Sequence, residues 1–270
     1  MNEFSQELID RSGYLAEGFA DVYDRHRPAP PPALLDVLAL VAQVERPRLV
    51  VDVGCGTGLS TRAWVDRAEQ VVGVEPNPRM VERARRATTA PNVRYVEAYA
   101  AETGLPAGGA DLVTVSQAFH WMEPGAVLEE AARILRPGGV FAAYDYDVPP
   151  LVEPDVDEAF ARFFEGRRAA RTRLGMEAGA AVWPKEGHLE QIRASGRFRY
   201  ARELVCNGWD EADADRICGL AESIGGPAAI FERAPEVGEA HHHLKEVAHR
   251  ILGERTWPMV VGYRIRLGIV

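Results

Sequence analysis

Three glycines spaced two residues apart are the residues of this chain best suited to hold a ligand. Residues 51–58 read VDVGCGTG, a short apolar run that ends at Gly54, Gly56 and Gly58, and Leu59 opens a helical pattern. Glycine tolerates the positive backbone angles of a tight strand-to-helix turn and lets a ligand approach bare backbone. This spacing predicts a nucleotide-like ligand at the carboxyl end of a parallel sheet.

The same spacing excludes two phosphate-binding motifs. Leu59 stands where a GxGxxG dinucleotide fingerprint has its third glycine, and no Gly-Lys-Ser/Thr triplet follows as in a P-loop. The predicted ligand therefore carries a ribose and a base but no phosphate.

Composition limits the partners that the chain can have. A formal charge of −9 argues against a partner bound mainly through phosphates, so nucleic acid is not expected. The 47% hydrophobic residues suffice for the core of one large domain or of a core with an inserted cap. The amino terminus shows neither a secretory signal nor a membrane span, so we expect a cytoplasmic protein without a membrane partner. Three scattered cysteines predict reduced thiols.

Strand and helix patterns alternate along the first half of the chain and predict a doubly wound parallel sheet. Helices are expected over the first 27 residues and over 34–44, on either side of a proline-rich spacer. The predicted strands are 49–53, 71–74, 93–96, 112–115 and 140–144, followed by a long helical stretch to about residue 195 that we interpret as a cap over the carboxyl edge. A weaker strand at 199–205 should pair with a closing strand at 259–270, with helices at 211–224 and 236–253 between them.

Together these residues resemble the class I S-adenosylmethionine-dependent methyltransferases. The resemblance rests on VDVGCGTG, on Glu75 in VVGVEPNPRM, and on Leu105-Pro106 ahead of ADLVTVSQAFHW. It is strongest with the small-molecule group that includes trans-aconitate and ubiquinone-type methyltransferases (methyltransferase type 11-like), and it covers about residues 15 to 146. It implies a Rossmann-like doubly wound seven-stranded sheet, with the last strand antiparallel, and a mostly helical cap. The predicted parts are 1–147 (amino-terminal helices and cofactor-binding core), 148–196 (cap) and 197–270 (completion of the sheet).

The resemblance implies S-adenosylmethionine as the cofactor. Glu75 has an acceptor-only side chain that can take both ribose hydroxyls, and Asp52 either braces the loop or accepts from the cofactor's amino group. Ala101 and Glu102 match the adenine-binding position, although Glu102 could simply cap a turn. The cofactor-binding residues predicted in this way are Asp52, Gly54, Cys55, Gly56, Thr57, Gly58, Glu75, Pro76, Ala101, Glu102, Gln117 and Trp121.

Candidate catalytic residues are His120, Tyr144 and Tyr23. His120, with an ordinary pKa of about 6.5, can take a proton from an acceptor, although an isolated histidine is more often structural. Phe119 or Trp121 could line the sulfonium by cation–π attraction. Tyr144, in the run Tyr144-Asp145-Tyr146-Asp147, could orient a hydroxyl or merely pack in an edge turn. Tyr23 lies in a segment that closes over the cofactor in the family.

Two further clusters of charged or titratable residues lie outside the predicted cofactor site. Five arginines (Arg162, Arg167, Arg168, Arg171 and Arg173) form either a solvated helix face or a patch that receives an anionic substrate. The run His241-His242-His243 is not expected to bind a metal, because consecutive helical residues point about 100° apart.

The predicted activity is methylation of a small-molecule acceptor on oxygen, nitrogen or carbon by in-line transfer. The alternative is a protein that binds the cofactor without transferring its methyl group, as a regulatory module or a rearrangement catalyst. A nucleic-acid amino-methyltransferase is disfavoured because Ser116-Gln117-Ala118-Phe119 replaces the Asn/Asp-Pro-Pro-aromatic motif. A nicotinamide oxidoreductase is disfavoured by the missing GxGxxG. Homo-oligomerisation is left open.

Overall fold

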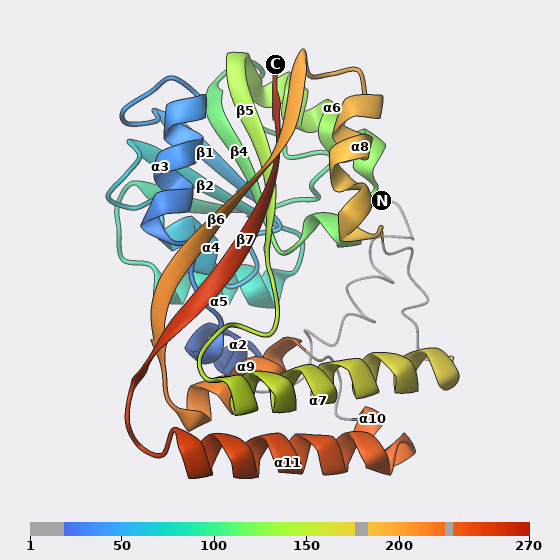
Figure 1. The fold of residues 1–270 in the computed structure, drawn as a ribbon. Coiled ribbons are helices and arrows are strands. Elements are labelled where there is room, and N and C mark those ends of the chain that lie inside the picture. The colour runs from blue at the N-terminus through green and yellow to red at the C-terminus, as the bar shows by residue number, and fades with distance from the viewer. Residues whose placement is uncertain (1–18, 176–182, 225–228) are drawn as a thin grey trace. The chain divides into compact units, whose positions relative to one another are not determined.

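A seven-stranded sheet in the order β3-β2-β1-β4-β5-β7-β6 forms the centre of the fold (Figure 1). The protein is represented by a computed structural model that describes residues 19–175, 183–224 and 229–270. The strands are β1 (Leu49–Val53), β2 (Gln70–Glu75), β3 (Val93–Glu97), β4 (Ala110–Ser116), β5 (Leu135–Tyr146), β6 (Tyr200–Ala212) and β7 (Trp257–Ile269).

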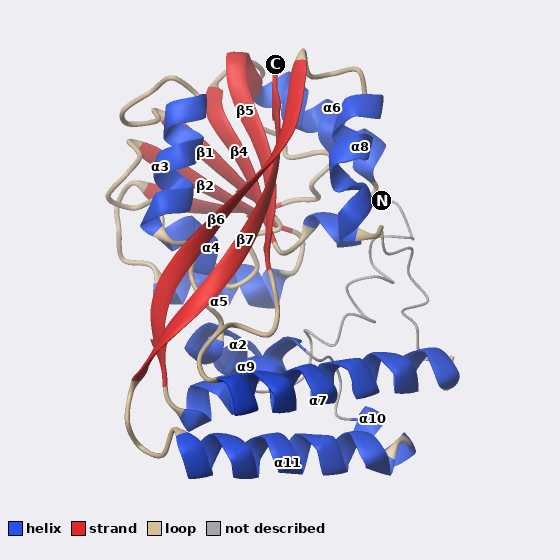
Figure 2. Cartoon of the chain, in the orientation of Figure 1, coloured by secondary structure: helices blue, strands red, loops and turns tan. Residues whose placement is uncertain are grey.

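The pairing of the strands confirms the predicted fold class. β1 pairs in parallel with β2 and β4, and the parallel pairs β2–β3 and β4–β5 extend the sheet on both sides. β7 pairs antiparallel with β5, and β6 runs beside β7 at the edge of the sheet (Figure 2). Both the antiparallel last strand and its pairing with the strand near residue 200 agree with the sequence-based expectation.

The two long strands after the core run further than the sequence predicts. β5 continues through Tyr146, two residues beyond the predicted end, because its ladder with β7 extends to the pair Tyr146 and Tyr263. The residues from Tyr144 to Tyr146 therefore belong to a strand rather than to a turn. β6 continues to Ala212, into the region where the sequence predicts the start of a helix, and α9 (Ala214–Ile224) begins two residues later.

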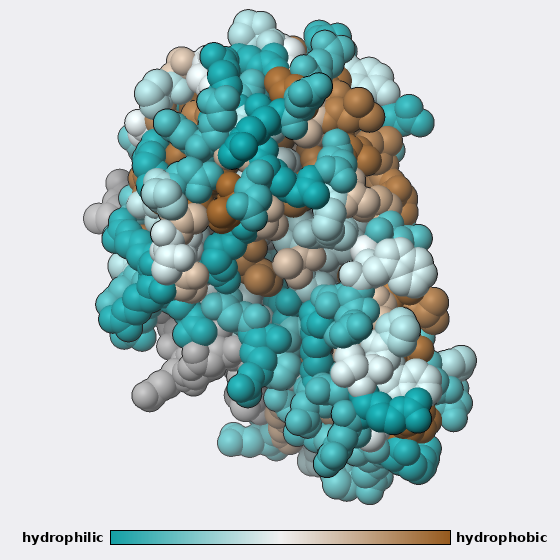
Figure 3. Space-filling model, turned by 90° about the vertical axis from the view of Figure 1, so that its left-hand side faces the viewer, coloured by the Kyte–Doolittle hydropathy of each residue, from teal (hydrophilic) through white to brown (hydrophobic). Residues whose placement is uncertain are grey.

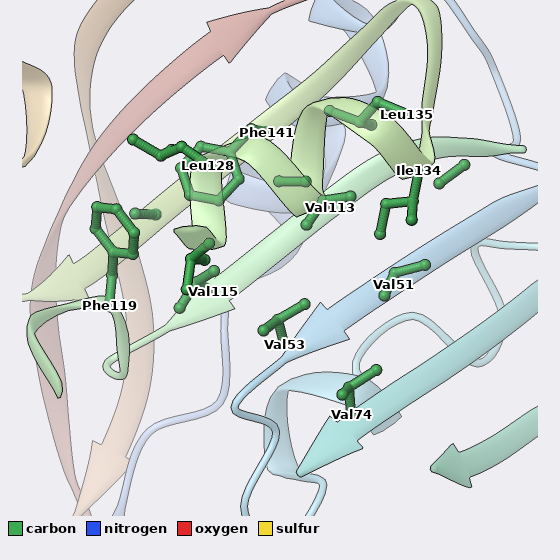
Figure 4. Packing of buried hydrophobic residues seen from close by; sticks show 14 of the residues in the cluster. Val51, Val53, Val74, Val113, Val115, Phe119, Leu128, Ile134, Leu135 and Phe141 are labelled. Atoms are coloured by element: carbon green, nitrogen blue, oxygen red, sulfur yellow. The ribbon is translucent and has the colours of Figure 1, made fainter. Parts of the chain in front are cut away.

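Helices cover both faces of the sheet. They are α3 (Pro32–Val41), α4 (Leu59–Arg62), α5 (Pro78–Ala87), α6 (Pro124–Ile134) and α8 (His188–Ala194), with 3-10 turns η1 (Phe119–Trp121) and η2 (Lys185–Gly187). One face packs against α6 and α8, and Figure 4 shows its valines from neighbouring strands meeting the side chains of Leu128 and Ile134. On the other face, Val81 and Ala84 of α5 pack against Tyr95. These apolar layers fix the strand ends from which the site is built.

Two of these helices, α5 and α6, begin with the same N-terminal capping pattern. In α5 the Asn77 side chain accepts a hydrogen bond from the Arg79 amide at 3.0 Å, and Pro78 occupies the first turn. In α6 Glu123 accepts from the amides of Gly125 and Ala126, again with a proline next in sequence. A polar cap followed by proline satisfies the free amides of a helix start. The caps thus fix where both helices leave the carboxyl edge.

The chain divides into two compact units. One comprises residues 29–146, 182–208 and 262–270 and holds most of the sheet; the other comprises 1–28, 147–181 and 209–261. The helices of this second unit are α2 (Phe19–His26), α7 (Pro154–Arg173), α9, α10 (Ala229–Arg233) and α11 (Pro235–Ile251). The first 18 residues of the predicted amino-terminal helix lie outside the described residues. The domain boundaries at 147 and 196 stay predictions.

The arginines of α7 are not all alike. Arg162 pairs with Glu158 at 2.9 Å and Arg173 pairs with Glu236, both at the surface. Arg167 is only 4% exposed and its guanidinium lies 5.9 Å from the centroid of the Phe163 ring. Burial, followed by repulsion from Arg171, lowers the pKa of Arg167 to about 10. A fully solvated helix face therefore does not describe this position.

The surface is largely hydrophilic on the face shown in Figure 3, with smaller apolar patches between the polar residues. Among the described helices, none is both long enough and apolar enough to span a bilayer.

Candidate functional site

The glycine run forms a tight turn between β1 and α4. Val74 O, at the end of β2, accepts hydrogen bonds from the amides of Gly54 at 2.8 Å and Cys55 at 3.1 Å. Gly54, Gly56 and Gly58 have φ angles of 68°, 54° and 81°. All three lie in the left-handed region that glycine adopts without strain. The turn thus brings bare backbone to the carboxyl ends of β1 and β2.

The three glycines differ in what surrounds them. A Cβ at Gly54 would lie 2.5 Å from Met122 Cε and 2.9 Å from Ala118 Cβ, and one at Gly58 would collide with the Tyr95 hydroxyl. A Cβ at Gly56 would meet no atom within 4 Å. Gly54 and Gly58 are therefore required by packing within the protein. Gly56 leaves an open side on which a ligand can lie.

Asp52 braces this turn from inside the protein. Its side chain is fully buried and accepts hydrogen bonds from Ser60 Oγ at 2.6 Å, Thr61 Oγ1 at 2.7 Å and Thr114 Oγ1 at 3.0 Å. Burial raises the pKa of Asp52 above its ordinary value, against the effect of the three hydroxyls. These bonds tie β1, α4 and β4 together beneath the glycines. A contact between Asp52 and the cofactor stays a prediction.

Glu75 holds the other side of the turn. Its Oε2 accepts from the Gly56 amide at 3.0 Å, and its Oε1 accepts from the Asn77 amide at 3.0 Å. Each oxygen of a carboxylate can accept about two hydrogen bonds, so each retains capacity for one more. Burial raises the pKa of Glu75, while the two amides oppose this shift. The arrangement suits a ligand that offers two neighbouring hydroxyls.

Of the other predicted cofactor residues, Gln117 and Trp121 follow β4, and the rest lie next to Asp52 and Glu75 in sequence or in the loop after β3. Thr57 and Cys55 are buried within the turn, and Pro76 follows Glu75 directly. Burial, followed by the charges of Asp52 and Glu75, raises the pKa of the Cys55 thiol well above its ordinary value, which makes it a poor nucleophile. Ala101 and Glu102 are exposed in the loop after β3, where the Glu102 amide donates to Tyr99 O at 3.0 Å.

A group of buried and partly buried charged and polar side chains lies at the ends of β4 and β5. We call it the edge cluster; it consists of Gln117, His120, Asp145, Lys185, His188 and Arg266. Asp145 is 4% exposed, and its carboxylate lies 2.7 Å from Lys185 Nζ and 3.2 Å from Arg266 Nη1. The side chains of His120 and His188 approach the same carboxylate to 4.0 Å and 3.8 Å. A buried carboxylate thus has two cations to offset its desolvation.

Comparison with known proteins agrees with this geometry. Residues 51–143, which contain the glycine turn and Glu75 and end within β5, match the family model of a methyltransferase domain. Residues 51–143 thus belong to a methyltransferase domain.

The curated relatives align with this chain over part of their length. An uncharacterized methyltransferase of Mycobacterium tuberculosis is 40% identical over 117 residues, or 43% of this chain and 46% of the relative. The trans-aconitate 2-methyltransferase of an Azoarcus species is 38% identical over 123 residues, covering 43% and 47% of the two chains. The chain thus spans about half the length of the curated relatives it matches.

Solved structures resemble a larger share of this chain. A structure from Anaeromyxobacter dehalogenans assigned to the type II methyltransferases has a TM-score of 0.65 at 26% identity, covering 90% of this chain and 97% of that one. The phosphoethanolamine N-methyltransferase 2 of Haemonchus contortus, solved with phosphomonomethylethanolamine and S-adenosylhomocysteine, has a TM-score of 0.54 at 15% identity, covering 97% of this chain and 59% of that one. The second likeness shows the fold alone.

The candidate catalytic residues of this chain have different surroundings. His120 lies in η1 with 13% of its side chain exposed and has Asp145 as a neighbouring carboxylate. Tyr144 is 1% exposed, and burial, followed by the charge of Asp52, raises its pKa well above the ordinary value. Tyr23 belongs to the other unit, where the Arg27 guanidinium lies 4.0 Å from its ring centroid. The structure thus brings His120 and Gln117 into one cluster, and all three catalytic roles stay predictions.

No sequence motif marks three members of the edge cluster: Lys185, His188 and Arg266. Lys185 and His188 follow the sheet core by some 40 residues, and only the fold returns them to β4 and β5. Arg266 alternates with apolar residues in β7, a pattern that predicts a solvent-facing side chain, yet it is 4% exposed. A usable signal was present in β5, because an aspartate in an otherwise buried strand requires a cationic or hydrogen-bonding partner.

Proposed function

We propose that this chain is an S-adenosylmethionine-dependent methyltransferase that acts on a small-molecule acceptor. The observation that carries the proposal is the open side of Gly56 next to a Glu75 carboxylate with acceptor capacity to spare. A nucleoside that lies on this backbone places its ribose hydroxyls on Glu75 without steric conflict. The absence of a phosphate-binding glycine pattern at residues 51–58 favours a nucleoside without phosphates.

Different residues of the site would contact different parts of the cofactor. Glu75 would hold the ribose, the loop of Ala101 and Glu102 would contact adenine, and the glycine turn would carry the central part. When bound, S-adenosylmethionine supplies an electrophilic methyl group on sulfur. The chain's own contribution is then alignment and exclusion of water, which account for much of the rate of an in-line transfer.

A small acceptor fits the charge and the relatives of the chain. The formal charge of −9 disfavours nucleic acid, and one relative is named a trans-aconitate 2-methyltransferase. Transfer to oxygen, nitrogen or carbon remains within the proposal. Where the acceptor must lose a proton, His120 is the candidate base, and Asp145, 4.0 Å from its Nδ1, would stabilise the imidazolium that forms.

Transfer of label from methyl-labelled S-adenosylmethionine tests the proposal. Purified protein is incubated with panels of carboxylic acids, amines and phenols, and products are resolved by chromatography. Label in a product supports a methyltransferase. Binding of the cofactor without label transfer to any compound in the panels would favour the alternative, a protein that binds the cofactor but does not transfer its methyl group.

The role of His120 is tested in the same assay. Replacement by asparagine keeps a polar side chain but removes the base, so a role in proton transfer predicts a loss of about 100-fold or more in kcat. KM for the cofactor should stay within about twofold, since His120 is not proposed to bind it. An unchanged kcat with a labelled acceptor contradicts general-base catalysis.

A further inference from the structure

Residues 183–188 are held against the end of β4 by several contacts within one unit. The Trp183 amide donates to His120 O at 3.0 Å, and the His188 ring packs edge-on against Phe119 at a centroid distance of 4.8 Å. Between them, Lys185 Nζ donates to Gln117 Oε1 at 2.9 Å and lies 2.7 Å from Asp145 Oδ1. Lys185 is therefore fixed between a buried carboxylate and an amide.

This contact determines which way the Gln117 amide is turned. An ammonium group has three donors and no acceptor, so the atom that it contacts must be the amide oxygen. The opposite orientation would place an N–H group against the ammonium. Gln117 Nε2 must then face away from Lys185. This atom is buried and has no hydrogen-bond partner within the part of the chain that the structure describes.

The backbone of Gln117 is held in an unfavourable conformation at the same point. Its φ is 53°, in the left-handed region that residues other than glycine seldom adopt. Its amide donates to Tyr144 O at 3.0 Å, and the next residue, Ala118, lies against Gly54 of the glycine turn. Such strain persists where the surrounding structure fixes it, and it is found preferentially at ligand sites. Here it sets the amide beside the glycine turn.

A second buried donor lies four residues further on. Trp121 Nε1 is buried and has no hydrogen-bond partner among residues 19–175, 183–224 and 229–270. Each of these unused donors, one of which has a lysine behind it, would gain from an acceptor-rich, negatively charged group such as a carboxylate. A buried donor left unpaired is costly, so a bound carboxylate would remove a penalty present in the free protein.

The strand order indicates which carboxylate can reach Gln117 Nε2. Glu75 ends β2, the glycine turn follows β1, and Gln117 follows β4, in the spatial order β2-β1-β4. Two strand spacings separate the ends of β2 and β4, or about 10 Å. A ligand with its ribose at Glu75 that crosses the glycine turn would bring its other end to Gln117. In S-adenosylmethionine that end is an amino acid.

We propose that Lys185 is a positioning residue that turns the Gln117 amide so that Nε2 donates to the amino-acid carboxylate of the bound cofactor. This proposal rests on the proposed function. Lys185 itself does not touch the cofactor. It lies outside the residues that match the methyltransferase domain model, and it acts on the ligand only through Gln117.

Calorimetric titration with two probes tests the proposal. S-adenosylhomocysteine carries the amino-acid carboxylate, whereas 5′-methylthioadenosine lacks it and keeps the base and the ribose. Lys185→Met should weaken the binding of S-adenosylhomocysteine about tenfold or more, the value of a hydrogen bond to a charged group, and leave methylthioadenosine within about twofold. Lys185→Arg, which can still donate to Gln117 Oε1, should restore most of the affinity.

Two further variants complete the test. Gln117→Glu removes the Nε2 donor and should show the same selective loss as Lys185→Met. Lys245→Met, in the other unit, removes the ion pair with Glu222 and should change neither affinity. Equal losses for both probes in Lys185→Met, or no loss for either, would overturn the proposal. Failure of the wild-type protein to bind either probe would overturn the proposed function and this inference with it, whereas wild-type binding without the selective loss overturns the inference alone.

Discussion

At the scale of single residues, three glycines and two carboxylates have separate roles, some in packing the turn and some in receiving the ligand. Gly54 and Gly58 are needed because side chains there would collide with other parts of the protein, whereas Gly56 faces open space. Asp52 is occupied by three hydroxyls, and Glu75 keeps acceptor capacity. Ligand recognition should therefore depend on Gly56 and Glu75, and the stability of the turn on the others.

Gly56→Ala tests whether Gly56 serves the ligand rather than the packing of the turn. The new side chain costs about 1–2 kcal/mol of stability, because its φ of 54° is unfavourable for alanine, and it also occupies the space proposed for the ligand. Gly108→Ala is a matched control, since Gly108 has a φ of 68°, no neighbour within 4 Å and a place ahead of β4, at the opposite edge of the sheet. Both variants should lose similar stability in urea denaturation. Only Gly56→Ala should lose affinity for S-adenosylhomocysteine, by more than about tenfold.

Equal affinities in the two alanine variants would contradict the placement of the ligand on Gly56.

Asp52→Asn is predicted to change how stability depends on pH. The pKa of Asp52 is higher in the folded protein than its ordinary value of 3.8, so the folded state binds this proton more tightly than the unfolded state. Its contribution to stability is then greatest below the unfolded pKa and falls as the pH rises through the folded pKa. Asparagine does not titrate, and the hydroxyls can turn to accept from its amide.

The free energy of unfolding of Asp52→Asn, relative to the wild type, should therefore increase between pH 4.5 and pH 7.5 in urea titrations. The opposite trend would show that the three hydroxyls outweigh the effect of burial.

At the scale of elements, the closing strand does more than complete the sheet. β7 pairs with β5 over seven residues, from Val140 to Tyr146, and brings Arg266 to the buried Asp145. Arg266 Nε also contacts Glu203 of β6 at 2.8 Å. The late strands thus supply the charge that stabilises a carboxylate at the end of the parallel core.

Arg266→Met tests the importance of this pair. Removing one partner of a buried ion pair leaves the other charge uncompensated and costs about 3–5 kcal/mol. Arg264→Met is the control on the same strand, because Arg264 has 47% of its side chain exposed and its ion pair with Glu203 spans 3.8 Å. An exposed pair of this kind contributes about 1 kcal/mol or less. Comparable losses of unfolding free energy in the two variants would contradict a structural role for the buried pair.

At the scale of the whole molecule, local patterns in the sequence were sufficient to predict the parallel core. Alternating apolar runs and helical patterns predicted β1 to β5. The candidate cofactor residues at the ends of β1 and β2 lie together through contacts between neighbours in sequence or in the sheet. The extension of β5 to Tyr146 could not be predicted, because it depends on pairing with residues more than 100 positions away. Lys185 and Arg266 were missed because only the fold brings them to Asp145.

The two units also limit what the sequence can indicate about the acceptor. Candidate residues for substrate contact are divided between them: His120 and Tyr144 lie in the unit with most of the sheet, and Tyr23 and Arg167 lie in the other. Helical periodicity locates α7 but does not distinguish Arg167, which is buried, from Arg162, which is paired at the surface. Side-chain burial on a helix depends on its partner helices, here mainly α11.

The most direct test of the central claim is calorimetric titration of the wild-type protein with S-adenosylmethionine. We expect one binding site per chain with a Kd between about 1 μM and 1 mM, the range of typical enzyme KM values. Binding should be abolished or weakened by more than about tenfold in Gly56→Ala and retained in Gly108→Ala. Absence of measurable binding to the wild-type protein at about 1 mM ligand, a concentration that would reveal even a weak enzyme ligand, would contradict the account.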